Sequence, residues 1–433
     1  MVDLEKTQNV YFIGIGGSGM SSIASLVLSN GKKVSGSDRD TTETTKELEN
    51  KGIKIFHNQK PENISSDIDL VVYTVAIPEN NPELQRAKEL KIPFISYPEF
   101  IGKVSNDMKT IAVSGTHGKT TTTAMLAHIL KDTEINPTVI IGARMNNQNS
   151  NFISGNGKYL LIEADEYKKS FLNLYPTYLV ITNIDEDHLD FYKNLNDIQK
   201  TFKELADRTP QEGAIICDAS NPHIIPVIKE SKIKVIDYEQ PVSLQLQVVG
   251  EHNRKNALSA YSMAKYLGID EQFILDKLKS FTGVKRRFEY KGVTKNGSKI
   301  YDDYAHNPQK VNSALQGAKE AFPNKKVVAI FQPHLYSRTK LLLTEFGESF
   351  KYADEIILLP IYGAREEFDP TISSEMLKTE IIKHNKKVKV MDVDSVLNEI
   401  NGKKKEDIVV ILGAGDITNL ATTLTNSSSN FVH

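Results

Sequence analysis

Strand-like and helix-like segments alternate through the first hundred residues. Strands are predicted at 10–15, 33–37, 53–56, 70–74 and 93–96, and helices at 18–29 and 42–51. Strands that alternate with helices typically form a parallel sheet with helices on its faces. We therefore predict an α/β arrangement for this part of the chain.

Two further alternating units follow. The second, from about residue 109, has predicted strands at 159–162, 178–182 and 214–217 and a helix at 253–267. The third has predicted strands at 327–331, 355–359, 388–390 and 408–412. We predict a Rossmann-like domain at 1–107, a central phosphate-loop α/β domain at 108–283 and a Rossmann-like domain at 284–433.

Composition narrows the functional classes. The 53 basic and 55 acidic residues nearly balance, which argues against a nucleic-acid surface or a polybasic membrane surface. The sequence contains no apolar run long enough to cross a membrane. One cysteine, Cys217, excludes an internal disulfide framework and suits a reducing cytoplasm, where we expect it to be a buried, inert thiol.

The segment 111–123 is the most informative in the chain. An apolar run ends at Val113, Gly115-Thr116-His117-Gly118-Lys119-Thr120 follows, and a helix is predicted from Thr121 to Leu130. Backbone N–H groups, a helix N-terminus and a lysine together bind a triphosphate, and the threonine hydroxyl can hold Mg²⁺. The general pattern places its first glycine at position 113, which is valine here, so a plain glycine turn is the competing interpretation.

A second glycine loop follows the first predicted strand. Gly14, Gly16 and Gly19 fit the dinucleotide-type pattern Gly-x-Gly-x-x-Gly, and Asp38 lies where an acidic residue would meet a ribose hydroxyl. The pattern indicates a diphosphate on a helix N-terminus without saying which nucleotide carries it. A nicotinamide-dependent dehydrogenase is the simplest analogy, and a ligand-free turn is the alternative.

Acidic residues follow two strands of the central unit. Glu163, Asp165 and Glu166 follow the strand at 159–162, and His188 lies in an acidic loop after the strand at 178–182. Carboxylates at strand ends near a phosphate loop are well placed for Mg²⁺, and we favour Glu163 for that role. The His188 loop suits a second cation or the orientation of a nucleophile, although a lone histidine is usually structural.

The chain resembles the ATP-dependent Mur ligases of peptidoglycan synthesis along essentially its whole length. Nine short motifs occur in the family's order, at 14–20, 115–120, 163–166, 183–188, 252–257, 285–288, 302–306, 332–338 and 413–416. The pattern is most similar to that of members that join L-alanine to UDP-N-acetylmuramate. Beside that family, the displaced glycine of the phosphate loop looks like the family's own variant, Gly-Thr-x-Gly-Lys-Thr.

The resemblance implies a role for each motif. The UDP-sugar would be bound by Gly16, Gly17, Ser18, Gly19, Met20, Ser37 and Asp38. ATP would be bound by Gly115, Thr116, His117, Gly118, Lys119, Thr120, Thr121, His252, Asn253, Asn256, Arg287 and Asp303. Thr120 and Glu163 would share one Mg²⁺, and His188 would bind a second. The catalytic set would be Lys119, Glu163, His188, His334 and Arg338, with His334 and Arg338 receiving the amino acid.

The implied reaction is amide formation through an acyl phosphate. Transfer of the γ-phosphoryl group gives the substrate carboxylate a good leaving group, and the amine then displaces phosphate. Lys119, Mg²⁺ and backbone amides would offset the repulsion among the anions. The implied partners are UDP-N-acetylmuramate, L-alanine and ATP, with no nucleic acid or membrane, in a cytoplasmic monomer or weak homodimer.

The sequence departs from the family pattern at a few positions. A second histidine is usual at position 307 and an arginine at 335, where this chain has Asn307 and Leu335. An aspartate is common at the position of Lys168. Later Mur ligases carry a carbamylated lysine where we place Phe202, next to Lys203, and Phe202 agrees with the alanine-adding members.

Other functions stay open at this point. A murein-peptide ligase would use the same nucleotide sugar, and a divergent amide ligase would share the motifs. A nicotinamide-dependent oxidoreductase fused to an NTPase leaves Glu163 and His188 without a role. A non-catalytic UDP-sugar sensor is disfavoured because Lys119, Thr120, Glu163 and His188 are intact.

Overall fold

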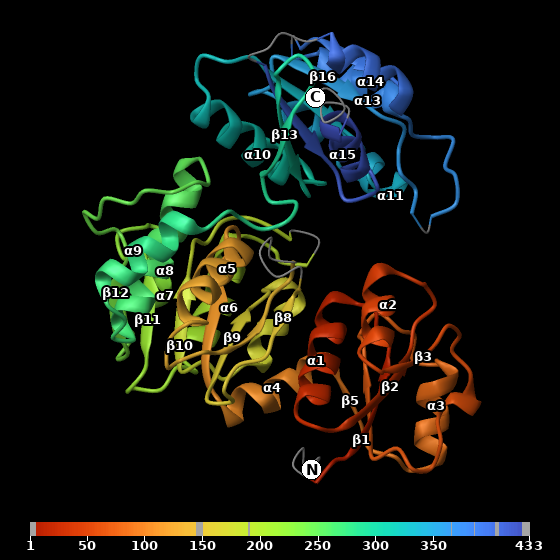
Figure 1. Ribbon diagram of the computed structural model, residues 1–433, viewed down its shortest axis with the longest axis vertical. Coiled ribbons are helices and arrows are strands. Elements are labelled where there is room, and N and C mark those ends of the chain that lie inside the picture. Colours follow the sequence, from red (N-terminus) through yellow and green to blue (C-terminus); the bar gives the residue numbers. More distant parts are fainter. Residues whose placement is uncertain are drawn as a thin grey trace, which may run out of the picture. The chain divides into compact units, whose positions relative to one another are not determined.

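The computed structural model describes residues 6–143, 150–188, 191–364, 366–384, 386–402 and 407–426. Three sheets follow one another along the chain, as the colours of Figure 1 show. Contacts divide the chain into two compact units, 1–246 with 255–281, and 247–254 with 282–433. The predicted α/β fold with three successive, largely parallel sheets is confirmed, whereas the predicted boundaries at 107 and 283 stay predictions.

The first sheet is fully parallel, with strand order β3-β2-β1-β4-β5. Its strands are β1 Asn9–Ile13, β2 Lys33–Ser37, β3 Lys54–Phe56, β4 Leu70–Tyr73 and β5 Phe94–Ser96, and its helices are α1 Ser18–Ser29, α2 Glu43–Asn50, α3 Pro82–Glu89, α4 Tyr97–Asp107 and the 3₁₀ turn η1 Pro61–Asn63. Strand β1 ends two residues before the predicted position 15, because Gly14 has a positive φ of 81° and starts the glycine loop. A capping box between Ser96 and Glu99 begins α4.

The second sheet carries the phosphate loop and has strand order β12-β11-β10-β6-β9-β7-β8. Its strands are β6 Lys109–Ser114, β7 Thr138–Ile140, β8 Phe152–Ile153, β9 Tyr159–Glu163, β10 Tyr178–Ile181, β11 Ala214–Cys217 and β12 Lys234–Asp237. Its helices are α5 Lys119–Leu130, η2 Tyr167–Asn173, α6 Leu195–Ala206, α7 Ile225–Ile228, α8 Glu251–Tyr266 and α9 Glu271–Ser280. Among the strands described for this sheet, β8 alone runs antiparallel to its neighbour, β7. Cys217 is fully buried in β11, and burial raises the pKa of its thiol to about 12, as expected for an inert thiol.

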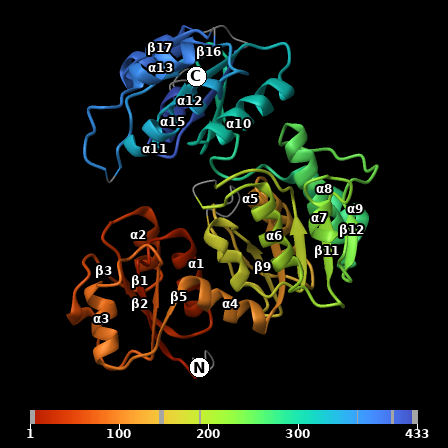
Figure 2. The same cartoon turned by 180° about the vertical axis from the view of Figure 1, so that it is seen from behind.

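The third sheet has strand order β13-β14-β18-β15-β16-β17, and two of its strands, β16 and β17, are labelled in Figure 2. Its strands are β13 Glu289–Val293, β14 Lys299–Asp303, β15 Val327–Phe331, β16 Glu355–Leu358, β17 Val388–Val390 and β18 Ile408–Leu412. Its helices are α10 Pro308–Ala321, α11 Tyr336–Leu341, α12 Leu343–Glu348, α13 Ser374–Ile382, α14 Val393–Asn401 and α15 Thr418–Asn426. Strands β15 and β18 are buried along their whole length, which explains why their sequences are continuous apolar runs.

Apolar clusters line both faces of the third sheet. Phe331, Phe346 and Phe350 belong to the cluster on one face, and Ile300, Val409 and Ile411 belong to that on the other. Within the described residues, no helix combines the length and apolar character that a membrane crossing needs.

The packing of Phe331 yields a stability prediction. Its ring lies 5.4 Å from that of Phe346 and 5.5 Å from that of Phe350, and all three side chains are fully buried. Phe331→Ala should destabilise this unit by roughly 3–5 kcal/mol through lost burial and the cavity it leaves. Urea unfolding would measure the loss. Ile382→Ala, at a position 47% exposed, is the control and should change stability by less than about 0.5 kcal/mol.

Candidate functional site

The phosphate loop lies between β6 and α5 and requires its glycines. Gly115 and Gly118 have φ values of 139° and 81°. A Cβ on Gly115 would lie 2.0 Å from Thr182 Oγ1, and one on Gly118 would lie 2.1 Å from Asn256 Oδ1. The end of β10 holds the loop, because Asn183 Oδ1 accepts a hydrogen bond of 2.9 Å from the backbone N–H of His117. Asn256, predicted from sequence to bind the same nucleotide, is therefore brought against this loop.

Lys119 and Glu166 form a buried ion pair beside the loop. Their side chains are 13% and 3% exposed, and Lys119 Nζ lies 2.7 Å from Glu166 Oε2. Lys119 Nζ also donates to the carbonyl oxygens of Gly115 at 2.5 Å and Thr116 at 3.3 Å. Burial alone would lower the pKa of Lys119, but the nearby charges of Glu166, Asp165 and Glu163 outweigh burial and raise it. Lys119 is therefore a cation held in the loop.

Thr120 and Glu163 meet where β6 and β9 run side by side. The Thr120 hydroxyl donates to Glu163 Oε1 at 2.7 Å, and Glu163 Oε2 accepts from the backbone N–H of Gly142 at 2.7 Å. These two side chains were predicted to share one Mg²⁺, and the structure brings them into contact. A hydroxyl and a carboxylate are hard oxygen donors of the type that Mg²⁺ prefers.

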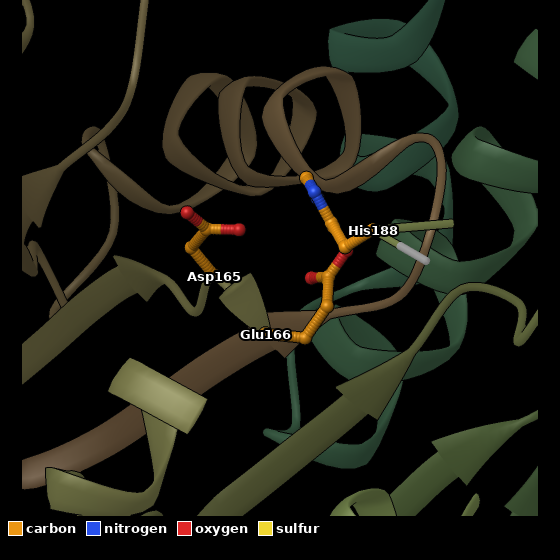
Figure 3. A group of neighbouring side chains, drawn as sticks. All are labelled: Asp165, Glu166 and His188. Carbon is orange, nitrogen blue, oxygen red and sulfur yellow. The ribbon is translucent and has the colours of Figure 1, made fainter. Parts of the chain in front are cut away.

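His188 lies near a different pair of carboxylates. Asp165, Glu166 and His188 each offer a ligand atom, and these atoms all lie within 4.8 Å of one another (Figure 3). His188 Nε2 lies 3.9 Å from both Glu166 Oε1 and Asp187 Oδ2. Its backbone is left-handed, with φ of 54°, and its ring lies 4.7 Å from that of Tyr167. The residue types fit a divalent cation, although Glu166 and Asp165 were less favoured from sequence than Glu163.

Backbone geometry organises the N-terminal glycine loop. The N–H groups of Gly14 and Ile15 donate to the carbonyl of Ser37 at 2.8 and 3.0 Å, and that of Gly16 donates to Asp38 Oδ2 at 2.8 Å. A Cβ on Gly16 would lie 2.8 Å from the same oxygen and 2.9 Å from Thr45 Cγ2, so any other residue there would displace these side chains. The predicted residues Gly16, Ser37 and Asp38 therefore lie together. Gly17 and Ser18 are exposed, Gly19 is half-buried, and the Met20 side chain is buried.

A buried carboxylate network lies beneath this loop. The Ser37 hydroxyl is fully buried and donates to Glu83 Oε2 at 2.6 Å, while Tyr11 and Asn63 donate to Glu83 Oε1 at 2.8 and 2.7 Å. Burial raises the pKa of Glu83 despite these hydrogen bonds. The Ser37 side chain is therefore occupied within the fold, and its backbone carbonyl holds the loop.

The candidate nucleotide residues of the second unit fall in two groups. His252 packs against Gly317 in α10, where a Cβ on the glycine would lie 2.7 Å from His252 Cε1, and burial lowers the pKa of His252. The Asn253 amide donates to Val249 O at 2.8 Å. Separately, Asp303 accepts from the backbone N–H groups of Phe288 and Ala305, each at 2.8 Å. Asp303 therefore fixes the segment that contains Arg287.

His334 and Arg338 are neighbours at the carboxyl end of β15. Arg338 Nη1 lies 3.3 Å from His334 Nδ1, and the His334 ring stacks on that of Tyr362 at 5.7 Å. Burial and then the charge of Arg338 lower the pKa of His334. The ring of His306 lies 6.4 Å from that of His334, and burial lowers the pKa of His306 to about 3. Both imidazoles are therefore neutral near pH 7.

The structure shows the local setting of Asn307, Leu335 and Phe202, three positions singled out by comparison with the family pattern. Asn307 caps α10, since its side chain accepts from the backbone N–H of Lys310 at 2.9 Å. Leu335 has a φ of 71° and begins the turn into α11. Phe202 is fully buried, with its ring 5.2 Å from that of Phe171, and the adjacent Lys203 lies 3.2 Å from Asp207 on the outside of α6.

Several residues of these sites were not found from sequence. They are Glu83, Gly142, Tyr192, Tyr362 and Glu366. The Tyr192 hydroxyl donates to Glu166 O at 2.5 Å from a loop far along the chain. Glu83, Gly142 and Tyr362 lie in no glycine-rich or acidic cluster, whereas Glu366 is adjacent to Glu367 and three positions before Asp369. That acidic run, in the loop after β16, was the one available signal for Glu366.

The buried ion pair gives a stability prediction. Glu166→Leu should destabilise the unit by roughly 3 kcal/mol, because the Lys119 ammonium would stay buried without its carboxylate. The double variant Lys119→Met/Glu166→Leu should recover most of that loss, and urea unfolding of both variants would measure it. Equal losses in the single and double variants would instead attribute the effect to packing.

Comparison with known proteins gives matches along almost the whole chain. Three family models match in succession: the Mur ligase family, catalytic domain at 9–109; the Mur ligase middle domain at 113–243; and the Mur ligase, glutamate ligase domain at 286–415. The UDP-N-acetylmuramate–L-alanine ligase of Clostridium kluyveri is 41% identical, with 96% of this chain and 97% of that protein covered.

Solved structures extend the likeness to the fold. The UDP-N-acetylmuramate-alanine ligase of Thermotoga maritima has a TM-score of 0.80 and 29% identity, and covers 98% of this chain and 99% of its own. A murein peptide ligase of Psychrobacter arcticus shares the fold, with a TM-score of 0.69, 24% identity, and coverage of 98% of this chain and 100% of its own. On the identity and coverage of these relatives, the chain belongs to the Mur ligase family.

Proposed function

We propose that this chain is an ATP-dependent ligase that joins L-alanine to the carboxylate of UDP-N-acetylmuramate in peptidoglycan synthesis. The observation that carries the proposal is near-full-length similarity, at 41% identity, to a ligase of that name. The intact phosphate loop, with Lys119 and Thr120 in contact with Glu166 and Glu163, supports it, since a chain that had lost catalysis would have no need of these groups.

The ATP half of the reaction belongs to the second sheet. The backbone of 115–118 and the N-terminus of α5 would bind the triphosphate, with Lys119 as the adjacent cation. Asn256 lies against Gly118 and would border the same nucleotide. These groups favour transfer of the γ-phosphoryl group because they offset negative charge that spreads over the phosphoryl oxygens.

Magnesium fits the residues that flank the loop. Thr120 with Glu163, and His188 with Asp165 and Glu166, are the two donor sets that would hold it. When bound, the metal supplies a positive charge that neutralises phosphate oxygens. The Thr120–Glu163 contact and the cluster around His188 lie on the same edge of the sheet, at the carboxyl ends of β6, β9 and β10.

The nucleotide sugar and the amino acid would be bound by the first and third sheets, respectively. The loop 14–19 and the N-terminus of α1 would bind the diphosphate of the nucleotide sugar. Arg338 would pair with the carboxylate of the incoming amino acid, and His334 lies beside it. The amine of that amino acid then attacks the acyl phosphate carbon, and phosphate leaves with the bonding electrons while the amine proton passes to solvent or a nearby base.

The amino acid is best tested by direct competition of acceptors. The purified chain receives UDP-N-acetylmuramate, ATP and Mg²⁺ with alanine, serine, glycine or a murein tripeptide, and phosphate release is measured. We expect alanine to give the highest kcat/KM. Release with the tripeptide alone would make the chain a murein-peptide ligase, and release with none of the four would refute amide ligation to this sugar. We place the reaction in the cytoplasm and the active species as a monomer or weak homodimer.

A substitution at Lys119 tests which of the two glycine loops binds ATP and which binds the nucleotide sugar. Lys119→Ala should abolish phosphate release, a loss of at least about 10³-fold, because the phosphoryl oxygens lose their adjacent cation. Binding of UDP-N-acetylmuramate, measured by calorimetry, should stay within about twofold of the unmodified chain. Lys131→Ala, at the C-cap of the same helix, is the matched control.

The opposite result would reverse the loop assignment. If Lys119→Ala lost nucleotide-sugar binding but kept ATP hydrolysis, the loop 14–19 would be the ATP site. Circular dichroism of the variant would verify that the buried Glu166 carboxylate, left without its cation, has not unfolded the unit.

A further inference from the structure

The turn that precedes α11 has a strained backbone. Leu335 has φ of 71° and ψ of 131°, a backbone conformation that residues other than glycine rarely adopt. Two backbone hydrogen bonds fix it, from Leu335 N–H to Tyr362 O at 2.9 Å and from Tyr362 N–H to Pro333 O at 2.8 Å. Such strain persists only where contacts from the surrounding structure hold the backbone in place. Here the loop after β16 provides them through Tyr362.

The same loop also holds the first turn of α11. Glu366 Oε2 accepts from the backbone N–H of Ser337 at 3.0 Å, and Glu366 Oε1 accepts from the Ser337 hydroxyl. Both carboxylate oxygens of Glu366 thus accept hydrogen bonds from a single residue in the first turn of α11. Hydrogen bonds from Ser337 lower the pKa of Glu366, so the carboxylate stays ionised at neutral pH. The ring of Phe368 packs edge-on against that of Tyr336 at 5.7 Å.

Helix α11 is short and carries a functional candidate one residue beyond this contact. Its six residues, Tyr336–Leu341, include Arg338, whose Nη1 lies 3.3 Å from His334 Nδ1. His334 precedes the strained turn, and its ring stacks on Tyr362. The loop after β16 therefore holds both side chains, His334 through its ring contact with Tyr362 and Arg338 through the contact of Glu366 with Ser337.

We propose that Glu366 is a positioning residue for the incoming amino acid. It holds the first turn of α11 so that the Arg338 guanidinium stands at the place and angle at which it pairs with the amino-acid carboxylate. This inference rests on the proposed function, in which Arg338 binds that carboxylate. Both oxygens of Glu366 accept from Ser337, so the role proposed here acts through helix α11 and not through contact with a substrate.

The test varies L-alanine at saturating ATP and UDP-N-acetylmuramate. Glu366→Ala should raise the KM for L-alanine by roughly tenfold, the effect of losing a helix cap on the residue it positions, while the KM values for ATP and the nucleotide sugar change less than about twofold. Glu366→Gln keeps one acceptor oxygen and should restore most of the affinity for alanine. Ser337→Ala keeps the backbone contact and should give a rise of roughly threefold.

The controls separate this idea from the proposed function and from a general loss of folding. Glu367→Gln, at the exposed neighbouring carboxylate, should leave every constant unchanged. If the unmodified chain releases no phosphate with alanine, the proposed function fails before this test begins. If it does, an unchanged KM for alanine in Glu366→Ala, or equal losses for all three substrates, overturns the positioning role. Should Glu366→Ala not fold, Glu366→Gln and Ser337→Ala provide the same test, in which the KM for alanine is compared with the KM values for ATP and the nucleotide sugar.

Discussion

The shared direction of parallel strands is the constraint on which every candidate site here depends. Because the strands run the same way, their carboxyl ends lie along one edge of each sheet, and the loops that leave that edge lie side by side. In the second sheet this brings together the loops after β6, β9 and β10, although the ends of β6 and β10, Ser114 and Ile181, are 67 positions apart along the chain. In the third sheet the same rule places the ends of β14, β15 and β18 next to one another.

That rule explains why much of the site could be predicted from sequence. A glycine loop between an apolar strand and a helix is a local signal, and both such loops lie where the strand and helix patterns placed them. The contact of Thr120 with Glu163 follows from the sheet, since β6 and β9 are neighbours with Val113 opposite Glu163. The strand order itself was not predicted, because nothing local states which parallel strands are adjacent.

Contacts between side chains from distant loops could not be predicted in the same way. Ser37 was expected to bind the UDP-sugar, yet its buried hydroxyl donates to Glu83, a residue of α3 that belongs to no recognisable motif. Glu166 was one of three similar carboxylates, and only packing against Lys119 and Tyr192 distinguishes it. The turn at Leu335 depends on Tyr362, which lies beyond a helix pair and a strand. In each case tertiary packing, not local preference, selects the partner.

The buried position of the Lys119 ammonium bears on selectivity among anions. An ammonium has three hydrogens, and in this structure acceptors for all of them lie within the protein, on Gly115, Thr116 and Glu166. Any phosphate that binds Lys119 must replace one of these acceptors. The lost hydrogen bond reduces the net binding free energy of the phosphate. A singly or doubly charged anion such as inorganic phosphate recovers little of that cost, whereas a triphosphate that also binds the loop amides recovers more. The contacts of Lys119 within the protein thus disfavour any anion whose binding free energy does not outweigh the loss of one of them.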